Sequence, residues 1–70
     1  MNKIILFGKE MCPMCNTAKQ LMNMKNISFE YEDDINKIKE TGFNALPILF
    51  ISEKNEYYVG EDAIKYIEEV

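Results

Sequence analysis

The only two cysteines of the chain, Cys12 and Cys15, lie between an apolar run and a helical pattern. Residues 3–7 form a largely apolar run that ends at Gly8, which is typical of a strand covered on both faces. From Pro13 to about residue 25 the apolar side chains follow one stripe of an amphipathic helix: Met14, Ala18, Leu21 and Met22. A strand, a short loop and a helix in this order place Cys12 at or just before the helix N-terminus.

This position favours a reactive sulfur at Cys12. At a helix N-terminus, unpaired N–H groups and the helix dipole stabilise negative charge. Helix N-termini and C-x-x-C spacings lower cysteine pKa values from about 8.5 to roughly 3.5–7.5. Pro13 suits the first helical turn, because its φ is fixed and it has no N–H to leave unpaired. We therefore predict a reversible dithiol/disulfide site, with Cys12 as the nucleophile and Cys15 as the resolving thiol.

A purely structural role for the cysteine pair is disfavoured. A chain of 70 residues predicts one small domain, residues 1–70, with a modest core, and small domains often depend on disulfide cross-links. A bridge between Cys12 and Cys15 would close only one turn, however. The loop-entropy estimate for such a ring is about 2 kcal/mol before any ring strain is subtracted.

The charge balance excludes several classes of function. The chain has 12 acidic residues and 8 lysines, with no arginine and no histidine. It is poorly suited to the phosphate contacts of nucleic-acid binding, and it lacks the commonest metal ligand. The run Ile4–Phe7 is too short for a signal peptide or a membrane span. We expect a cytoplasmic protein that binds neither nucleic acid nor membrane, in which C-x-x-C indicates redox or metal chemistry.

The next segment predicts a parallel strand. Residues 28–32 alternate as a half-buried strand does, and their spacing from the first strand predicts a right-handed βαβ unit. Asn26 is the expected left-handed stop of the preceding helix. The acidic residues at 30–34 could suggest a cation site. The simpler interpretation is that Asp33 or Asp34 caps the next helix while the glutamates face water.

The second half of the chain predicts a short helix, a hairpin and a last helix. The short helix would turn Ile35 and Ile38 inward and stop at Gly42. Pro47 can only begin a strand or lie at its edge, and the sequence itself gives no reason to expect a cis bond there. Residues 48–51 and 56–59 form the hairpin strands around a polar turn. The last helix, residues 61–69, would bury four side chains: Ala63, Ile64, Ile67 and Val70.

The predicted order of elements is β-α-β-α-β-β-α. It implies an α/β fold, with a four-stranded mixed sheet flanked by three helices. We expect the first strand to be central and its C-terminal end to deliver Cys12 to the surface.

Three stretches of the chain resemble the glutaredoxins of the thioredoxin superfamily, of the small dithiol C-P-x-C type. Residues 9–15, K-E-M-C-P-M-C, are similar to the family stretch K-x-x-C-P-Y-C. Residues 41–51, T-G-F-N-A-L-P-I-L-F-I, are similar to S-G-x-x-T-V-P-x-I-F-I. Residues 59–62, V-G-E-D, partly match the glycine-glycine-x-D segment that opens the last helix of the family. The resemblance covers essentially the whole chain.

The resemblance implies a thioredoxin-like fold with Pro47 cis and lying against the cysteine pair. It implies that Cys12 attacks a substrate disulfide, that Cys15 resolves the mixed disulfide, and that glutathione regenerates the dithiol. Glutathione would then be a reductant and co-substrate, and no cofactor would be tightly bound. The other partners would be disulfide-containing or glutathionylated proteins, with a reductase flavoprotein in the electron supply. We expect a monomer.

The resemblance also implies a glutathione site. Lys9 would meet a carboxylate, and the backbone of Leu46 would pair with the cysteinyl unit in a strand-like contact. Asp62 and the N–H groups at the start of the last helix would hold the γ-glutamyl end. The residues assigned to glutathione are Lys9, Met14, Leu46, Pro47, Gly60, Glu61 and Asp62.

The chain departs from the family pattern near the cysteines. Met14 replaces tyrosine, Ala45 and Leu46 replace threonine and valine, and the last-helix segment has a single glycine. Some glutaredoxin-like redoxins lack the glutathione determinants. They take electrons from thioredoxin reductase, often to serve ribonucleotide reductase, and such a redoxin is the first alternative.

Metal binding is an alternative of another class. Met11, Cys12 and Cys15 supply three soft sulfurs that could hold Cu(I), or bridge an iron–sulfur cluster between two chains. Copper carriers usually show M-x-C-x-x-C, whereas here the methionine directly precedes the cysteine. Two cysteines are too few for a closed zinc site in one chain. We therefore assign no metal ligand.

Overall fold

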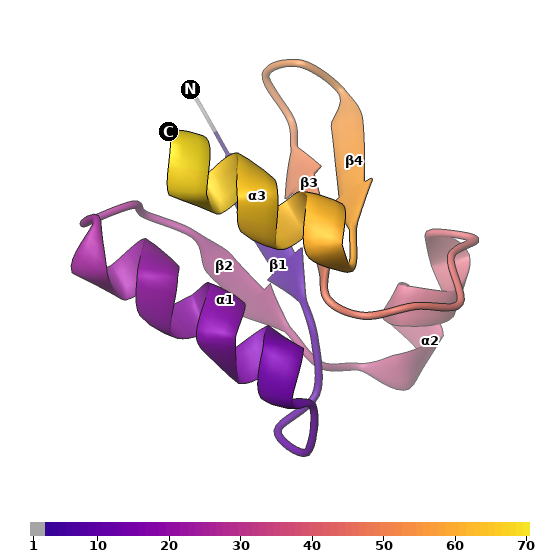
Figure 1. The fold of residues 1–70 in the computed structure, drawn as a ribbon. Helices are drawn as coiled ribbons and strands as arrows, with labels where there is room; N and C mark the ends of the chain where they lie inside the picture. The colour runs from indigo at the N-terminus through magenta and orange to yellow at the C-terminus, as the bar shows by residue number, and fades with distance from the viewer. Residues whose placement is uncertain (1–2) are drawn as a thin grey trace.

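The computed structural model describes residues 3–70 and contains the predicted elements in the predicted order (Figure 1). Their bounds are β1 Ile4–Phe7, α1 Pro13–Met24, β2 Glu30–Glu32, α2 Ile35–Glu40, β3 Ile48–Ile51, β4 Glu56–Val59 and α3 Glu61–Glu69. The second strand is shorter than predicted, because β1 offers pairing partners only from Glu30 onward. Among the described residues, none of the helices has the length and apolar character needed to cross a bilayer.

The strands form one mixed sheet in the order β2-β1-β3-β4. β1 runs parallel to β2 and antiparallel to β3, and β3 and β4 form the predicted antiparallel hairpin. The prediction that β1 is central is confirmed. In this register Leu6 is paired with Tyr31 on one side and with Leu49 on the other.

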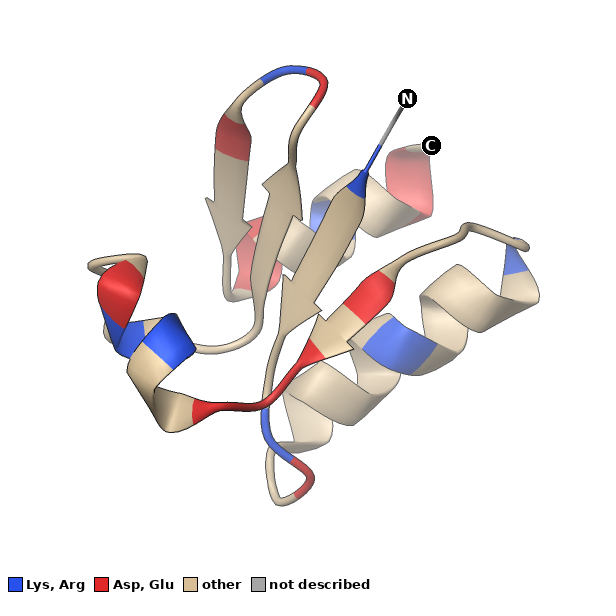
Figure 2. Cartoon of the chain, turned by 180° about the vertical axis from the view of Figure 1, so that it is seen from behind, with Lys and Arg blue, Asp and Glu red and all other residues tan. Residues whose placement is uncertain are grey.

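Alternation along the central strands divides the core between the two sheet faces. Leu6 and Leu49 pack with Ala18 and Met22 of α1 and with Ile67 of α3. The neighbouring strand residues Phe7 and Ile48 face the opposite way and form a second cluster with Ile38 of α2. Figure 1 shows α1 and α3 together on one face of the sheet, and Figure 2 shows the other face, with α2 at its side. β1 is therefore apolar at every position because it contributes to two clusters.

Local signals set several ends of the elements as predicted. Asn26 follows α1 with a φ of 58°, and Gly42 follows α2 with a φ of 83°. Of the two aspartates considered for the cap, Asp34 is the one whose carboxylate accepts a hydrogen bond of 2.8 Å from the backbone N–H of Asn36. Asparagine or glycine with a positive φ thus ends the first two helices, and an aspartate N-cap begins the second.

Two predicted core positions are wrong. Ile35 is 49% exposed, because α2 reaches the sheet through Ile38 and its first residue lies a turn away from that contact. Val70 is 59% exposed, because it follows the last residue of α3 and is no longer part of the helical stripe. Ile38, Ala63 and Ile67 are buried as predicted.

Candidate functional site: a dithiol at the start of α1

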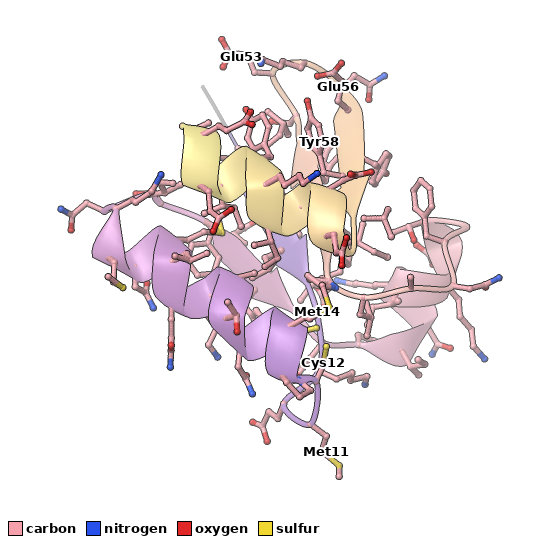
Figure 3. All side chains as sticks on the ribbon, viewed as in Figure 1. Met11, Cys12, Met14, Glu53, Glu56 and Tyr58 are labelled. Atoms are coloured by element: carbon pink, nitrogen blue, oxygen red, sulfur yellow. The ribbon has the colours of Figure 1, made fainter. Side chains whose placement is uncertain are left out.

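The loop after β1 delivers Cys12 to the N-cap position of α1. Cys12 has extended backbone angles, φ −96° and ψ 111°, and Pro13 is the first helical residue. The sulfur of Cys12 accepts a hydrogen bond of 3.2 Å from the backbone N–H of Cys15. Cys12 is half-buried, at the end of α1 that faces the loop in Figure 3. The predicted placement of this sulfur, partly accessible at a helix N-terminus, is confirmed.

Cys15 lies one turn further and is fully buried, with an exposed fraction of 0%. Burial, together with a hydrogen bond with Cys12, raises the pKa of the Cys15 thiol to about 11. The structure therefore contains two free thiols of different character. One can be reached by a substrate, and the other is a protonated, protected sulfur at neutral pH.

The close approach of β1 to α1 depends on Gly8. A Cβ atom at Gly8 would lie 2.9 Å from the Cβ and 2.9 Å from the sulfur of Cys15, and 3.2 Å from the hydroxyl oxygen of Tyr31. Real Cβ atoms do not come within 3.0 Å of such atoms, so only glycine fits here. The sequence pattern marks Gly8 only as the end of a strand and does not single out Tyr31. The alternation of β2 could have indicated Tyr31, since Phe29 and Tyr31 share the face covered by α1.

Leu46 and Pro47 lie at the same end of the sheet as the cysteines. Pro47 precedes Ile48, which pairs with Phe7, and Gly8 follows Phe7. The Leu46–Pro47 peptide bond is cis, as the resemblance implied. The carbonyl of Pro47 accepts a hydrogen bond of 2.8 Å from the N–H of Gly60. The segments around Pro47 and Gly60, distant in sequence, are therefore joined beside the dithiol end of β1.

Met14 lines a groove between α1 and the start of α3. The groove has a volume of about 390 Å³ and is lined by Met14, Thr17, Glu61, Ile64 and Lys65. Figure 3 shows the Met14 side chain close to Cys12 and toward α3. Asp62 is exposed in the first turn of α3. The structure thus brings together Met14 and Glu61, two of the residues assigned to glutathione. It adds Thr17, Ile64 and Lys65 to the same groove, which the sequence did not indicate.

Lys9 points to a different part of the molecule. Its ammonium group donates a hydrogen bond of 2.6 Å to the backbone carbonyl of Asp33, in the connection between β2 and α2. The lysine that the resemblance assigned to a glutathione carboxylate is therefore engaged with the protein backbone in this structure.

The three sulfurs considered for metal binding do not converge. Met11 is 95% exposed, and its side chain extends away from Cys12 and Met14 at the tip of the loop (Figure 3). Within residues 3–70, no group of three or more cysteine, histidine or acidic side chains is arranged to hold a metal ion.

These features define a class of protein: a thioredoxin-like fold that presents a C-x-x-C dithiol at a helix N-terminus beside a cis-proline segment. A family model described as Glutaredoxin matches residues 4–55, and the chain belongs to the glutaredoxin family. A solved structure of glutaredoxin 1 from Francisella tularensis, complexed with cacodylate, has a similar fold with a TM-score of 0.71 at 22% identity. The match covers 99% of this chain and 94% of that one. The search of curated proteins gave no match. Family and fold together support a thiol–disulfide oxidoreductase.

Proposed function

We propose that this chain is a glutathione-dependent oxidoreductase that reduces protein disulfides and glutathione mixed disulfides through Cys12 and Cys15. The observation that carries the proposal is the contrast between the two sulfurs. Cys12 is accessible at the start of α1, whereas Cys15 is buried one turn away with a pKa raised to about 11. A nucleophile must reach its substrate, and a resolving thiol must stay protected until a mixed disulfide forms beside it.

The exchange proceeds in two displacements. The Cys12 thiolate attacks one sulfur of the substrate disulfide, that disulfide bond breaks, and the released thiolate takes up a proton. The Cys15 thiol then loses its proton and attacks the sulfur of Cys12, which releases the second substrate thiolate and leaves a Cys12–Cys15 disulfide. Two glutathione molecules supply the two electrons that restore the dithiol, and they leave as glutathione disulfide.

The proposed glutathione site lies between the segments of Leu46 and Gly60. Leu46 lies outside the strands, and its N–H and C=O take part in none of the loop backbone hydrogen bonds found in residues 3–70. It could therefore pair with an extended peptide. No side chain of residues 3–70 caps the start of α3 after Gly60, which leaves backbone N–H groups for a carboxylate. We place the reaction in the cytoplasm, with a monomer as the active form.

A glutaredoxin-like redoxin reduced by thioredoxin reductase is the second candidate, and the charges around the site favour it. Lys9 is bonded to the carbonyl of Asp33, and Glu61 and Asp62 form an acidic first turn in α3. Glutathione brings carboxylates to this surface, and like charges repel them. A redoxin that docks a reductase needs no such carboxylate contacts.

One experiment separates the two candidates. Turnover of a glutathionylated substrate is measured with glutathione and glutathione reductase, and in parallel with thioredoxin reductase. The proposal expects turnover with glutathione, and turnover with thioredoxin reductase alone would establish the redoxin.

A second experiment tests Lys9. Lys9→Gln should raise the KM for glutathione if Lys9 turns from Asp33 to the ligand. Lys39 is an exposed lysine on α2, and Lys39→Gln is the matched control.

A further inference from the structure

The hydroxyl of Tyr31 and the sulfur of Cys15 both lie close to Gly8. A Cβ atom at Gly8 would lie 2.9 Å from the Cys15 sulfur and 3.2 Å from the Tyr31 oxygen, so both atoms border the space left by the missing side chain. Tyr31 reaches this position from β2, where it is paired with Leu6 of β1 on the face covered by α1. The strand, the loop glycine and the helix thus meet at the resolving thiol.

The Tyr31 hydroxyl is buried and finds no hydrogen-bond partner among residues 3–70. Buried polar atoms are nearly always bonded, and an unbonded one costs free energy. A phenylalanine would fill the same space without this cost. The unpaired Tyr31 hydroxyl is therefore available to donate a hydrogen bond to a group that becomes negatively charged near Gly8.

The charged and titratable groups around Tyr31 come from several elements. Burial raises the pKa of the Tyr31 hydroxyl, and the thiols of Cys15 and Cys12 and the carboxylates of Asp33 and Glu10 raise it further. Among residues 3–70, the one cation found over the Tyr31 ring is the ammonium group of Lys19, on α1, which lies 4.3 Å from the ring centre. The hydroxyl thus remains a proton donor throughout the neutral range, as a hydrogen-bond donor to an anion must.

We propose that Tyr31 assists the resolving step by donating a hydrogen bond to the Cys15 thiolate as it attacks the Cys12 mixed disulfide. This inference rests on the proposed dithiol exchange. The buried Cys15 sulfur must become an anion before it can react, and burial opposes that charge. Tyr31 keeps its own proton, and the Cys15 proton passes to solvent. The Cys15–Cys12 bond forms as the bond between Cys12 and the substrate sulfur breaks.

The expected size of the effect follows from two opposing terms. A hydrogen bond to a charged group favours ionisation by about one to two powers of ten. A thiolate with a lower pKa is also a weaker nucleophile, and this loss cancels about half of the gain in the logarithm of the rate. Removing the hydroxyl should therefore slow resolution by about 3- to 10-fold at neutral pH and move its pH profile to higher pH.

The test uses the reduced full chain and an aryl disulfide, dithiobis(nitrobenzoate), which releases a coloured thiolate at each displacement. Attack by Cys12 gives the first release and resolution by Cys15 the second, so one trace reports both steps. Tyr31→Phe should leave the first phase unchanged and slow the second, with its pH profile displaced upward. Tyr66→Phe, a tyrosine stacked on Tyr58, is the matched control and should change neither phase.

Two further results separate this inference from its alternatives. Tyr31→Phe should keep or raise the thermal unfolding midpoint, because the substitution removes an unpaired buried hydroxyl. A slower second phase together with a lower midpoint would indicate a structural role for Tyr31 instead. In a Cys15→Ser background, Tyr31→Phe should have no effect on the first phase. A wild-type trace without two phases would overturn the proposed exchange itself. A two-phase trace with the same second phase and pH profile in Tyr31→Phe would overturn only the role of Tyr31.

Discussion

The backbone N–H of Cys15 points at the sulfur of Cys12 across one helical turn, with a nitrogen–sulfur distance of 3.2 Å. This is the geometry of an N-cap, in which sulfur stands where a serine or aspartate oxygen is usual. Cys12, the proposed nucleophile, is therefore also the N-cap of α1. The N–H that its sulfur caps belongs to Cys15, the proposed resolving residue.

Cys12→Ser should abolish exchange without destabilising the fold. Serine is a preferred N-cap, so the hydrogen bond to the Cys15 N–H is kept while the nucleophile is lost. Activity is measured with protein disulfides and with a glutathionylated peptide, and stability by thermal unfolding. Cys15→Ser is the matched variant. It should trap mixed disulfides but still turn over the glutathionylated peptide, and full activity of Cys12→Ser on either substrate would show that the roles are wrongly assigned.

Alkylation of the reduced protein should modify Cys12 and spare Cys15. Cys12 is half-buried, whereas Cys15 is 0% exposed and burial raises its pKa to about 11. Iodoacetamide at neutral pH followed by peptide mass spectrometry measures the label at each cysteine. In denaturant both should be modified. Equal labelling in the folded protein would contradict the buried, neutral Cys15.

Gly8→Ala should destabilise the protein and disturb the dithiol. The new Cβ would meet Cys15 at 2.9 Å, and an overpacked core site costs about 1–3 kcal/mol. Chemical denaturation measures the loss, and the two-phase disulfide assay measures the thiols. Gly42→Ala is the control, since its Cβ has open space and its φ of 83° costs about 1–2 kcal/mol. Both variants should lose stability, but only Gly8→Ala should change the thiol kinetics.

Stability of the reduced protein should fall as the pH rises from about 9 toward 11. The Cys15 pKa is raised from 9.0 to about 11, so in this range the unfolded chain ionises the thiol while the folded chain does not. The unfolded state then binds fewer protons, and the free energy of unfolding decreases with pH. The raised pKa values of Tyr31 and Tyr58 act in the same direction. Denaturant midpoints should fall less steeply for Cys15→Ser, and identical slopes would contradict the assignment.

Much of the fold could be predicted because its signals are local. The positive φ of Asn26, the cap at Asp34 and the strand formed by the apolar run Ile48–Ile51 each depend on residues close in sequence. The family motifs likewise located Cys12 and the cis bond before Pro47. The errors at Ile35 and Val70 have one cause, since a periodic stripe does not say how far a neighbouring element extends.

The site divides in the same way. Spacing and periodicity along the chain settle where α1 begins, so the order of residues is enough to predict a thiol at the start of a helix after a buried strand. The surroundings of that thiol follow instead from long-range packing, which places Tyr31 near Gly8, turns Lys9 to Asp33 and bonds Gly60 to Pro47. These contacts join strands and loops far apart in the chain. Their partners are chosen by sheet register and packing, which no stretch of sequence contains.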